Sequence, residues 1–371
     1  MVKAVTQARK LRPALWVLPA LLVFLPFFQL GGCAAPSYYS QAISGHLGLM
    51  SKREDIDTIL EAGSIDPELA RELELSVEIR EFAVTQLYLP DNDSYTQFVR
   101  TGQDAVTWNV VAAPEFSLEP RKWCFMVSGC VPYRGYFKIE SAEKFARKLA
   151  QDGFDTSVSP AIAYSTLGWF DDPLLDTMFQ YSDEQLAAFI FHELAHQKLY
   201  VKGDTAFNEA YAGFIEETGV RLWLENTGRA EQLPEWLKLE KAGLQFNALL
   251  QDSVTRLNTL YASSLPEDQM RESKSTVFGE LREAYRSLVD TQWDGRSYYE
   301  SLLSRELNNA RLALINSYQG GACAFEKLFA EAEEEIARFH QLAIEKAALE
   351  SGQRSAWLNQ PCEAIASIGD L

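Results

Sequence analysis

The chain has 371 residues, of which 47% are hydrophobic and 23% are charged. These are ordinary values for a globular protein and provide enough apolar material for one large domain or two modest ones. The formal net charge is −18. Such a surface repels phosphates, so we expect no nucleic-acid partner.

The first 33 residues differ from the rest of the chain. Their basic residues all come before residue 13, and an uncharged apolar run follows from Ala14 to about Leu30. This order, completed by the small residues before Cys33, is typical of a secretory signal peptide. The alternative is a single transmembrane anchor, which three prolines within the segment disfavour. These prolines are Pro13, Pro19 and Pro26.

The sequence Leu30-Gly31-Gly32-Cys33 resembles the lipobox of bacterial lipoproteins. The resemblance implies that residues 1–32 are removed as a signal peptide and that Cys33 is lipidated. Residues 33–371 would then form a domain that is anchored to a membrane through lipid. Ala34 follows the cysteine, and in the sorting rule of such lipoproteins this residue directs the protein to the outer membrane, facing the periplasm.

The next part of the chain changes from helical to extended patterns. After a short tether, residues 38–88 are mostly helical in pattern, with Asp66 and Pro67 as a helix start. Residues 107–138 are rich in Val, Phe, Tyr and Trp and are interrupted by Pro and Gly, which predicts short strands and turns. A helix from Ala142 to about Asp152 and an extended segment from Thr156 to Gly168 follow.

From Ser182 onward the pattern is mainly helical, and no second apolar span is long enough to cross a bilayer. Long amphipathic segments are expected at about 206–226, 232–260, 266–289, 297–317 and 324–350. The expected fold class is therefore α+β and predominantly α-helical. A small β portion would accompany a zincin-like metal site on two antiparallel helices.

Four cysteines remain after Cys33, and an even number in an exported chain predicts disulfides. Of the possible connectivities we favour Cys124–Cys130 and Cys323–Cys362, because the members of each pair are close in sequence. The alternative is a metal site, which is disfavoured because no pair has the two-residue spacing of a zinc knuckle.

The segment His192-Glu193-Leu194-Ala195-His196 carries the strongest chemical signal. Ser182 and Gln185 form a capping box that starts a helix from about Asp183 to Leu199. His192 and His196, four residues apart, leave the same helix face and can bind one Zn²⁺. Glu193 lies close to that metal, where it can accept a proton as general base. The alternative is two helical histidines that make ordinary hydrogen bonds.

A second helix follows and offers carboxylates. Glu209 is the best candidate for a third metal ligand. Glu216 lies two turns further along the same face, where it could hydrogen-bond a ligand and fix its orientation. Glu217 is the alternative to Glu216 in that role.

These two segments resemble the gluzincin peptidases, the group that includes thermolysin and aminopeptidase N. In that group a second helix with Asn-Glu-x-x-Ala supplies a glutamate ligand, and residues 208–212 fit the pattern. The resemblance implies that Glu209 completes the metal site, that Glu193 is the general base, and that Asn208 and Glu216 support the ligands. The connection between His196 and Glu209 is shorter than is usual in those families.

The whole chain resembles the predicted aminopeptidase lipoproteins of proteobacteria. The resembling pieces cover most of the mature chain. They are the lipobox, residues 124–137, residues 163–173, the two metal helices and residues 308–310. The resemblance implies a peptide as the substrate.

The segment before the metal helix is a candidate for substrate binding. In zincins a strand in this place binds an extended peptide along the sheet edge, although an ordinary strand is the alternative. The residues assigned to this role are Ser165, Thr166, Leu167 and Gly168. The amine-binding Gly-Ala-Met-Glu-Asn segment of the aminopeptidase N group is absent. Asp171 or Asp172 is a candidate substitute for it, with a helix cap as the alternative.

A tyrosine often stabilises the oxyanion in such enzymes. Tyr164 and Tyr318 are assigned as catalytic candidates, and Tyr211 is a further one, with simple packing as the alternative for each. His46 and His340 show no partner spacing and are interpreted as structural or surface residues.

Two functions remain open at this point. The first is a lipid-anchored zinc metallopeptidase of the bacterial envelope, with aminopeptidase as the expected kind. The alternative is a non-enzymatic envelope interaction or assembly lipoprotein whose zinc site is structural or vestigial. Three protein ligands with an open fourth position would favour catalysis.

Overall fold

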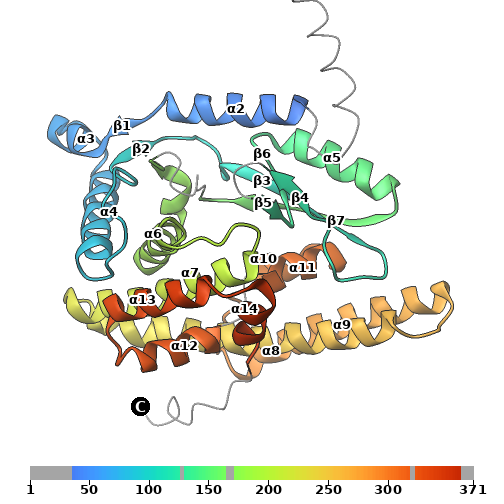
Figure 1. Cartoon of the computed structure of the whole chain (residues 1–371). Helices are drawn as coiled ribbons and strands as arrows, with labels where there is room; N and C mark the ends of the chain where they lie inside the picture. Colours follow the sequence, from blue (N-terminus) through green and yellow to red (C-terminus); the bar gives the residue numbers. More distant parts are fainter. Residues whose placement is uncertain (1–35, 126–128, 164–170, 318–321, 361–371) are drawn as a thin grey trace, which may run out of the picture.

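The computed structural model describes residues 36–125, 129–163, 171–317 and 322–360. Helices predominate among them, and short strands form small sheets, so the predicted class, α+β and mainly helical, is confirmed. In Figure 1 the strands lie between an upper layer that contains α2 (Pro36–Met50) and α5 (Ile139–Gln151) and a lower layer of long helices.

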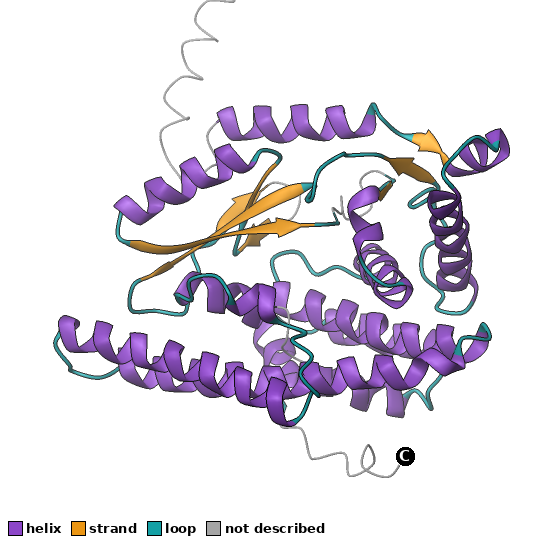
Figure 2. Ribbon diagram, turned by 180° about the vertical axis from the view of Figure 1, so that it is seen from behind, coloured by secondary structure: helices purple, strands orange, loops and turns teal. Residues whose placement is uncertain are grey.

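A three-stranded antiparallel sheet organises the upper half. β3 (Thr107–Pro114) lies between β6 (Arg134–Tyr136) and β7 (Phe154–Ala161). Side chains alternate along a strand, so Val110 and Ala112 pack with α5 while Val111 and Ala113 contact Ala310 of α11 (Asn309–Ser317). Figure 2 shows this sheet from behind, between the upper and lower helices.

The remaining described strands are short. β1 (Glu54–Asp55), β2 (Gln97–Val99) and β8 (Leu174–Leu175) form one sheet, and β4 (Trp123–Phe125) pairs with β5 (Gly129–Val131). Cys124 and Cys130 face each other in that hairpin and form a disulfide. Cys323 is also disulfide-bonded, and Cys362, its expected partner, lies outside the described residues.

The main core holds in place the two helices that carry the predicted metal site. Asp66 caps α4 by accepting the backbone N–H groups of Glu68 and Leu69, as predicted. The helices around this core are α3 (Ile56–Ala62), α4 (Pro67–Thr85), α6 (Asp183–Lys198), α7 (Thr205–Asn226), α12 (Ala322–Glu331), α13 (Ile336–Ala347) and α14 (Ser351–Leu358). Its large buried side chains are aromatic: Phe191, Phe207, Tyr211, Trp223, Phe325 and Phe339.

A hairpin of α8 (Leu233–Tyr261) and α9 (Glu267–Thr291) encloses a second core with the short α10 (Glu300–Leu303). Phe246, Leu281 and Tyr285 are buried there. Within the described part of the chain, no helix is both long and apolar enough to cross a membrane.

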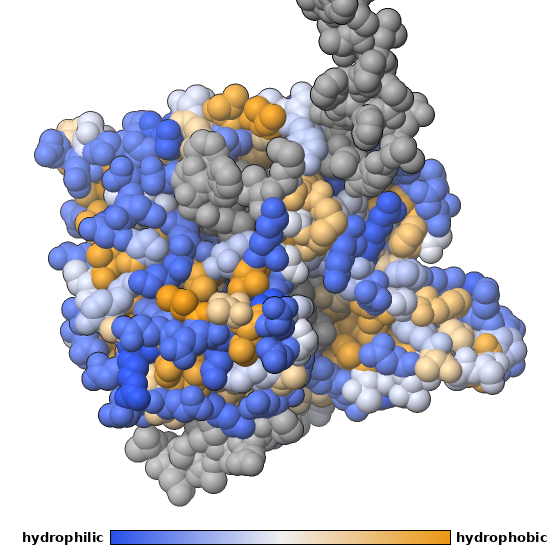
Figure 3. Space-filling view, viewed as in Figure 1, coloured by the Kyte–Doolittle hydropathy of each residue, from blue (hydrophilic) through white to orange (hydrophobic). Residues whose placement is uncertain are grey.

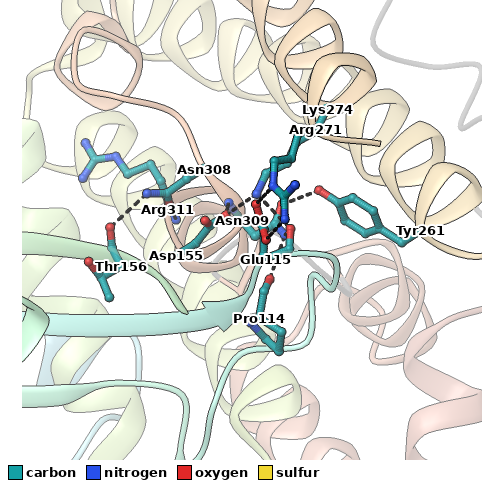
Figure 4. A network of polar contacts seen from close by, with 10 residues as sticks. All are labelled: Pro114, Glu115, Asp155, Thr156, Tyr261, Arg271, Lys274, Asn308, Asn309 and Arg311. Carbon is teal, nitrogen blue, oxygen red and sulfur yellow. Dashed lines mark hydrogen bonds and ion pairs between the residues drawn. The ribbon is translucent and has the colours of Figure 1, made fainter. Parts of the chain in front are cut away.

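A buried polar network ties this hairpin to the sheet (Figure 4). Asp155 of β7 accepts hydrogen bonds from Lys274 Nζ at 2.6 Å and from the backbone N–H of Asn309 at 2.9 Å. The Asn309 amide donates to the carbonyls of Pro114 and Glu115 and accepts from the Tyr261 hydroxyl. These groups satisfy one another, so the sheet and the hairpin are fixed to each other.

The sequence predicted two long helices that the structure divides, so these two predictions are wrong. The segment 297–317 is divided into α10 and α11, because Asn308 caps α11 through the N–H of Arg311 and Asn309 turns into the buried network. The segment 324–350 is divided into α12 and α13. Glu333 and Glu334 between them adopt φ of 58° and 60°, which breaks the helix.

Candidate metal centre

Helices α6 and α7 form the scaffold of the site. The capping box of Ser182 and Gln185 starts α6, as predicted. A Cβ on Gly219 of α7 would come within 2.8 Å of the Phe191 ring, so this glycine lets the two helices approach closely. His192 lies beside Glu216 and the later His196 beside the earlier Glu209, so the helices run antiparallel.

Three side chains converge between these helices. The Nε2 atoms of His192 and His196 are 3.1 Å apart. Glu209 places Oε2 at 3.4 Å from His192 Nε2 and Oε1 at 3.7 Å from His196 Nε2. One ligand atom from each of the three residues lies within 4.8 Å of the others.

This donor set fits a zinc ion. Tetrahedral zinc with bonds of about 2.0–2.1 Å separates its donor atoms by about 3.3 Å, which matches the observed spacing. Glu209 Oε2 is buried and has no hydrogen-bond partner among the described residues, although a buried carboxylate oxygen normally has one. Two imidazoles and a carboxylate are also the donor types of catalytic zinc sites.

The protonation states of His196 and Glu209 also suit metal binding. Burial and the neighbouring His192 lower the pKa of His196 to about 4, so this ring is neutral near pH 7. Burial opposes ionisation of Glu209, but contact with the two histidines outweighs that effect and lowers its pKa. A neutral imidazole and an ionised carboxylate are the forms that bind a metal.

Glu216 holds His192 in one orientation. Its Oε2 lies 2.8 Å from His192 Nδ1, so Nδ1–H donates to the carboxylate and Nε2 points toward His196 and Glu209, where a bound metal would displace the Nε2 proton. Burial lowers the pKa of His192, but the carboxylates of Glu209 and Glu216 more than reverse this and raise it well above the usual value. It is Glu216, and not the alternative Glu217, that hydrogen-bonds His192 in the described structure.

The side chain of Asn208 hydrogen-bonds to the backbone of the segment that connects α6 and α7. Its side chain accepts from the backbone N–H of Val201 at 2.8 Å and donates to the Val201 carbonyl at 2.9 Å. Asp204 caps α7 through the N–H of Phe207 and accepts from Arg354 Nε at 2.6 Å. Asn208 is thus fixed to the chain before α7, and it positions the adjacent Glu209 through the backbone.

A group of residues that the sequence did not reveal supports the next turn of α6. Gln197 accepts from Asn92 at 2.8 Å and donates to Asp172 Oδ2 at 3.2 Å. Tyr95 is 2% exposed with φ of 63°, and its pKa is raised by burial and by the nearby carboxylates of Glu193 and Asp172. Asp172, predicted either to bind a substrate amine or to cap a helix, is 1% exposed and bonded to this group.

The candidate metal ligands His192, His196 and Glu209 form one side of a cleft with a volume of about 340 Å³. Its walls come from α2, the central sheet, the β4–β5 hairpin and the two metal helices. The apolar and aromatic lining residues are Tyr38, Ala42, Phe125, Val131, Tyr133, Phe137, Ala161, Ala163 and Tyr200, and the polar ones include Thr107, Asn109 and Glu193. No lysine or arginine is among the described residues that line it.

Tyrosines near the ligands divide into two groups. Tyr200 lines the cleft, and its ring centroid is 6.4 Å from that of His196. Burial of its hydroxyl, and to a smaller extent the negative charge of Glu209, raise the pKa of Tyr200. No sequence pattern pointed to Tyr200, because it lies in the irregular connection between the helices. Tyr211 is fully buried and shares a hydrogen bond of 2.8 Å with His340, which also bonds to the Leu87 carbonyl, so both are packing residues.

Several predicted residues lie outside the described part of the chain. They are the oxyanion candidates Tyr164 and Tyr318, the proposed substrate strand of Ser165, Thr166, Leu167 and Gly168, and the lipidation site Cys33. Their roles stay predictions.

The family comparison agrees with a hydrolytic site. A family model described as “Putative aminopeptidase” matches residues 37–358, which is most of the chain. No curated protein and no solved structure matches the chain.

Proposed function

The chain belongs to the family described as “Putative aminopeptidase”. From that premise we propose that it is a zinc-dependent aminopeptidase anchored by lipid in the bacterial cell envelope. Membership of the family supports peptide hydrolysis. The convergence of His192, His196 and Glu209 beside a cleft is the observation that carries the zinc assignment. When bound, zinc would polarise the scissile carbonyl and make a water molecule more acidic.

Glu193 is the general base in this proposal. It follows His192 on α6 and lines the same cleft, so it can reach both the attacking water and the peptide. Its carboxylate takes a proton from the water and returns that proton to the leaving amine. Glu216 keeps His192 in the tautomer whose Nε2 is free to bind the metal.

The charges in the cleft favour an aminopeptidase over a carboxypeptidase. A carboxypeptidase needs a cation that binds the terminal carboxylate of its substrate, and the described lining contains no lysine or arginine. The free ammonium group of a peptide instead suits a cleft lined by Glu193 and Glu209. The aromatic and aliphatic walls suit an apolar side chain on the terminal residue.

A peptide-library digest with the detergent-solubilised full chain tests the substrate class. We expect single residues to be released from free amino ends, with apolar terminal residues removed fastest. N-acetylated copies of the same peptides are the matched control and should remain intact. Internal cleavage of the acetylated peptides would show an endopeptidase, and no cleavage of either set would favour a non-enzymatic role.

The lipid anchor is supported by Leu30-Gly31-Gly32-Cys33 after the apolar run. The mass of the amino-terminal fragment of the envelope protein tests it. We expect the fragment to begin at Cys33 with added acyl chains, and a fragment that begins upstream of Cys33 would contradict the anchor.

A further inference from the structure

Helix α2 has one face that is firmly attached to the domain. A Cβ on Gly45 would come within 2.2 Å of the Phe137 ring, so helix and ring are in close contact. Gln41 donates to the carbonyl of Gly135 and accepts from the N–H of Phe137, each at 3.3 Å. The Arg134 guanidinium lies 3.9 Å from the centre of the Tyr38 ring. These contacts prevent the helix from rolling, so its other face is fixed in direction.

That other face is uncharged and open to solvent, and it presents two aliphatic side chains beside Ser40, Ser44 and Gly48. Ile43 and Leu47, one helical turn apart, are 57% and 61% exposed. Tyr39, one turn earlier, is half-buried. Figure 3 shows an apolar patch at the upper edge of the molecule, over α2. Single exposed aliphatic side chains are common on proteins, but aligned neighbours on one helix face indicate a contact surface.

The charge distribution singles out the same helix. The protein has 52 acidic residues and a net charge of −18, but residues 36–50 contain no Asp, Glu, Lys or Arg. Lys52 and Arg53 follow directly and are exposed. Exposed Glu54 and Asp55 balance these two cations, so the observation that suits a phospholipid surface is the uncharged helix itself, whose aliphatic side chains can enter the headgroup region.

The distance along the chain brings this face to the bilayer. Cys33 precedes Pro36, the first residue of α2, by three residues. Three extended residues span at most about 10 Å. If Cys33 carries the lipid, α2 therefore starts within about 10 Å of the membrane surface.

We propose that the outer face of α2, with Ile43 and Leu47, lies on the phospholipid bilayer that holds the anchor. This inference rests on the anchoring part of the proposed function and adds a defined orientation to it. Tyr38 and Ala42, on the inner side of the same helix, line the cleft. The cleft wall then lies about one helix diameter, about 10 Å, from the membrane surface.

Photo-crosslinking in the membrane-anchored full chain tests this orientation. A benzophenone amino acid is placed at position 43, 47 or 244 of the protein in vesicles of phosphatidylethanolamine and phosphatidylglycerol. Leu244 on α8 is the matched control, because it is 60% exposed and α8 belongs to the lower layer of helices, away from α2 in Figure 1. We expect phospholipid adducts at 43 and 47 with a yield at least about ten times that at 244.

Other crosslinked products would overturn the inference. Crosslinks from position 47 to a second copy of the chain, to another protein or to another part of the same chain would each identify a different occupant. Equal lipid yields at 47 and 244 would show that α2 has no preferred contact with the membrane. The acylation of Cys33 and peptide hydrolysis are measured on the same samples. An acylated, active protein without adducts rejects the orientation alone, whereas a protein without acylation rejects the anchor as well.

Discussion

Replacing Glu216 with glutamine should weaken zinc binding without unfolding the protein. In the structure, Glu216 Oε2 is 2.8 Å from His192 Nδ1, and this contact sets the tautomer that leaves Nε2 free. Glutamine keeps the size and can still accept a hydrogen bond, but it lacks the charge. A charge-assisted hydrogen bond is about twice as strong as a neutral one, so part of the orienting effect should be lost.

The size of the effect follows from the geometry. Removing a hydrogen-bond partner of a metal-binding histidine costs about 10- to 100-fold in metal affinity. The Glu216 side chain is 32% exposed, so water can replace part of the contact. We therefore expect about a tenfold loss for Glu216→Gln, which corresponds to about 1.4 kcal/mol, and a larger loss for Glu216→Ala.

Competition for zinc against a chromophoric chelator measures these affinities. Glu225→Gln is the matched control, because Glu225 lies on the same helix α7 and is exposed to solvent. The control should bind zinc as tightly as the original protein. Equal affinity of Glu216→Gln and Glu225→Gln would refute the orienting role of Glu216.

Three further substitutions probe the cleft and the fold. Tyr200→Phe should lower the turnover number by about tenfold or more and leave zinc content unchanged if its hydroxyl stabilises the oxyanion, and unchanged turnover would remove it from the mechanism. Asn309→Ala should lower the free energy of unfolding in urea by about 2–4 kcal/mol, because it removes three hydrogen bonds of a fully buried side chain, those with the carbonyls of Pro114 and Glu115 and with the Tyr261 hydroxyl. Burial lowers the pKa of His340 to about 4, so between pH 6.5 and 4 the unfolded chain binds a proton that the folded chain does not. The free energy of unfolding should therefore fall by up to about 3 kcal/mol as the pH is lowered from 6.5 to 4. His340→Gln should remove this part of the pH dependence.

Features that depend on neighbours in the sequence could be predicted. Ser182 and Gln185 cap a helix three residues apart, and Asp66 with Pro67 starts another, because these bonds are local. The helical period alone places His192 and His196 on one face. The two metal helices could be paired because the chain between them is short.

Features that depend on distant contacts could not be predicted. Helix α11 begins at Asn309, whose side-chain amide bonds to carbonyls 194 and 195 residues earlier in the chain, which no local pattern reveals. Tyr38 and Ala42 line the cleft only because α2 packs across the sheet. Asn92 and Tyr95, from the loop after α4, bond to Gln197 of α6 and to Asp172, contacts between segments far apart in the sequence.

The central claim is that one zinc, held by His192, His196 and Glu209, serves a peptidase whose base is Glu193. Zinc content by elemental analysis and aminopeptidase turnover, measured together on the full chain and on Glu193→Gln, test it most directly. We predict about one zinc per chain in both proteins and a loss of at least about 100-fold in turnover for the variant. Equal turnover of the two proteins, or a protein that hydrolyses peptides without zinc, would contradict the account.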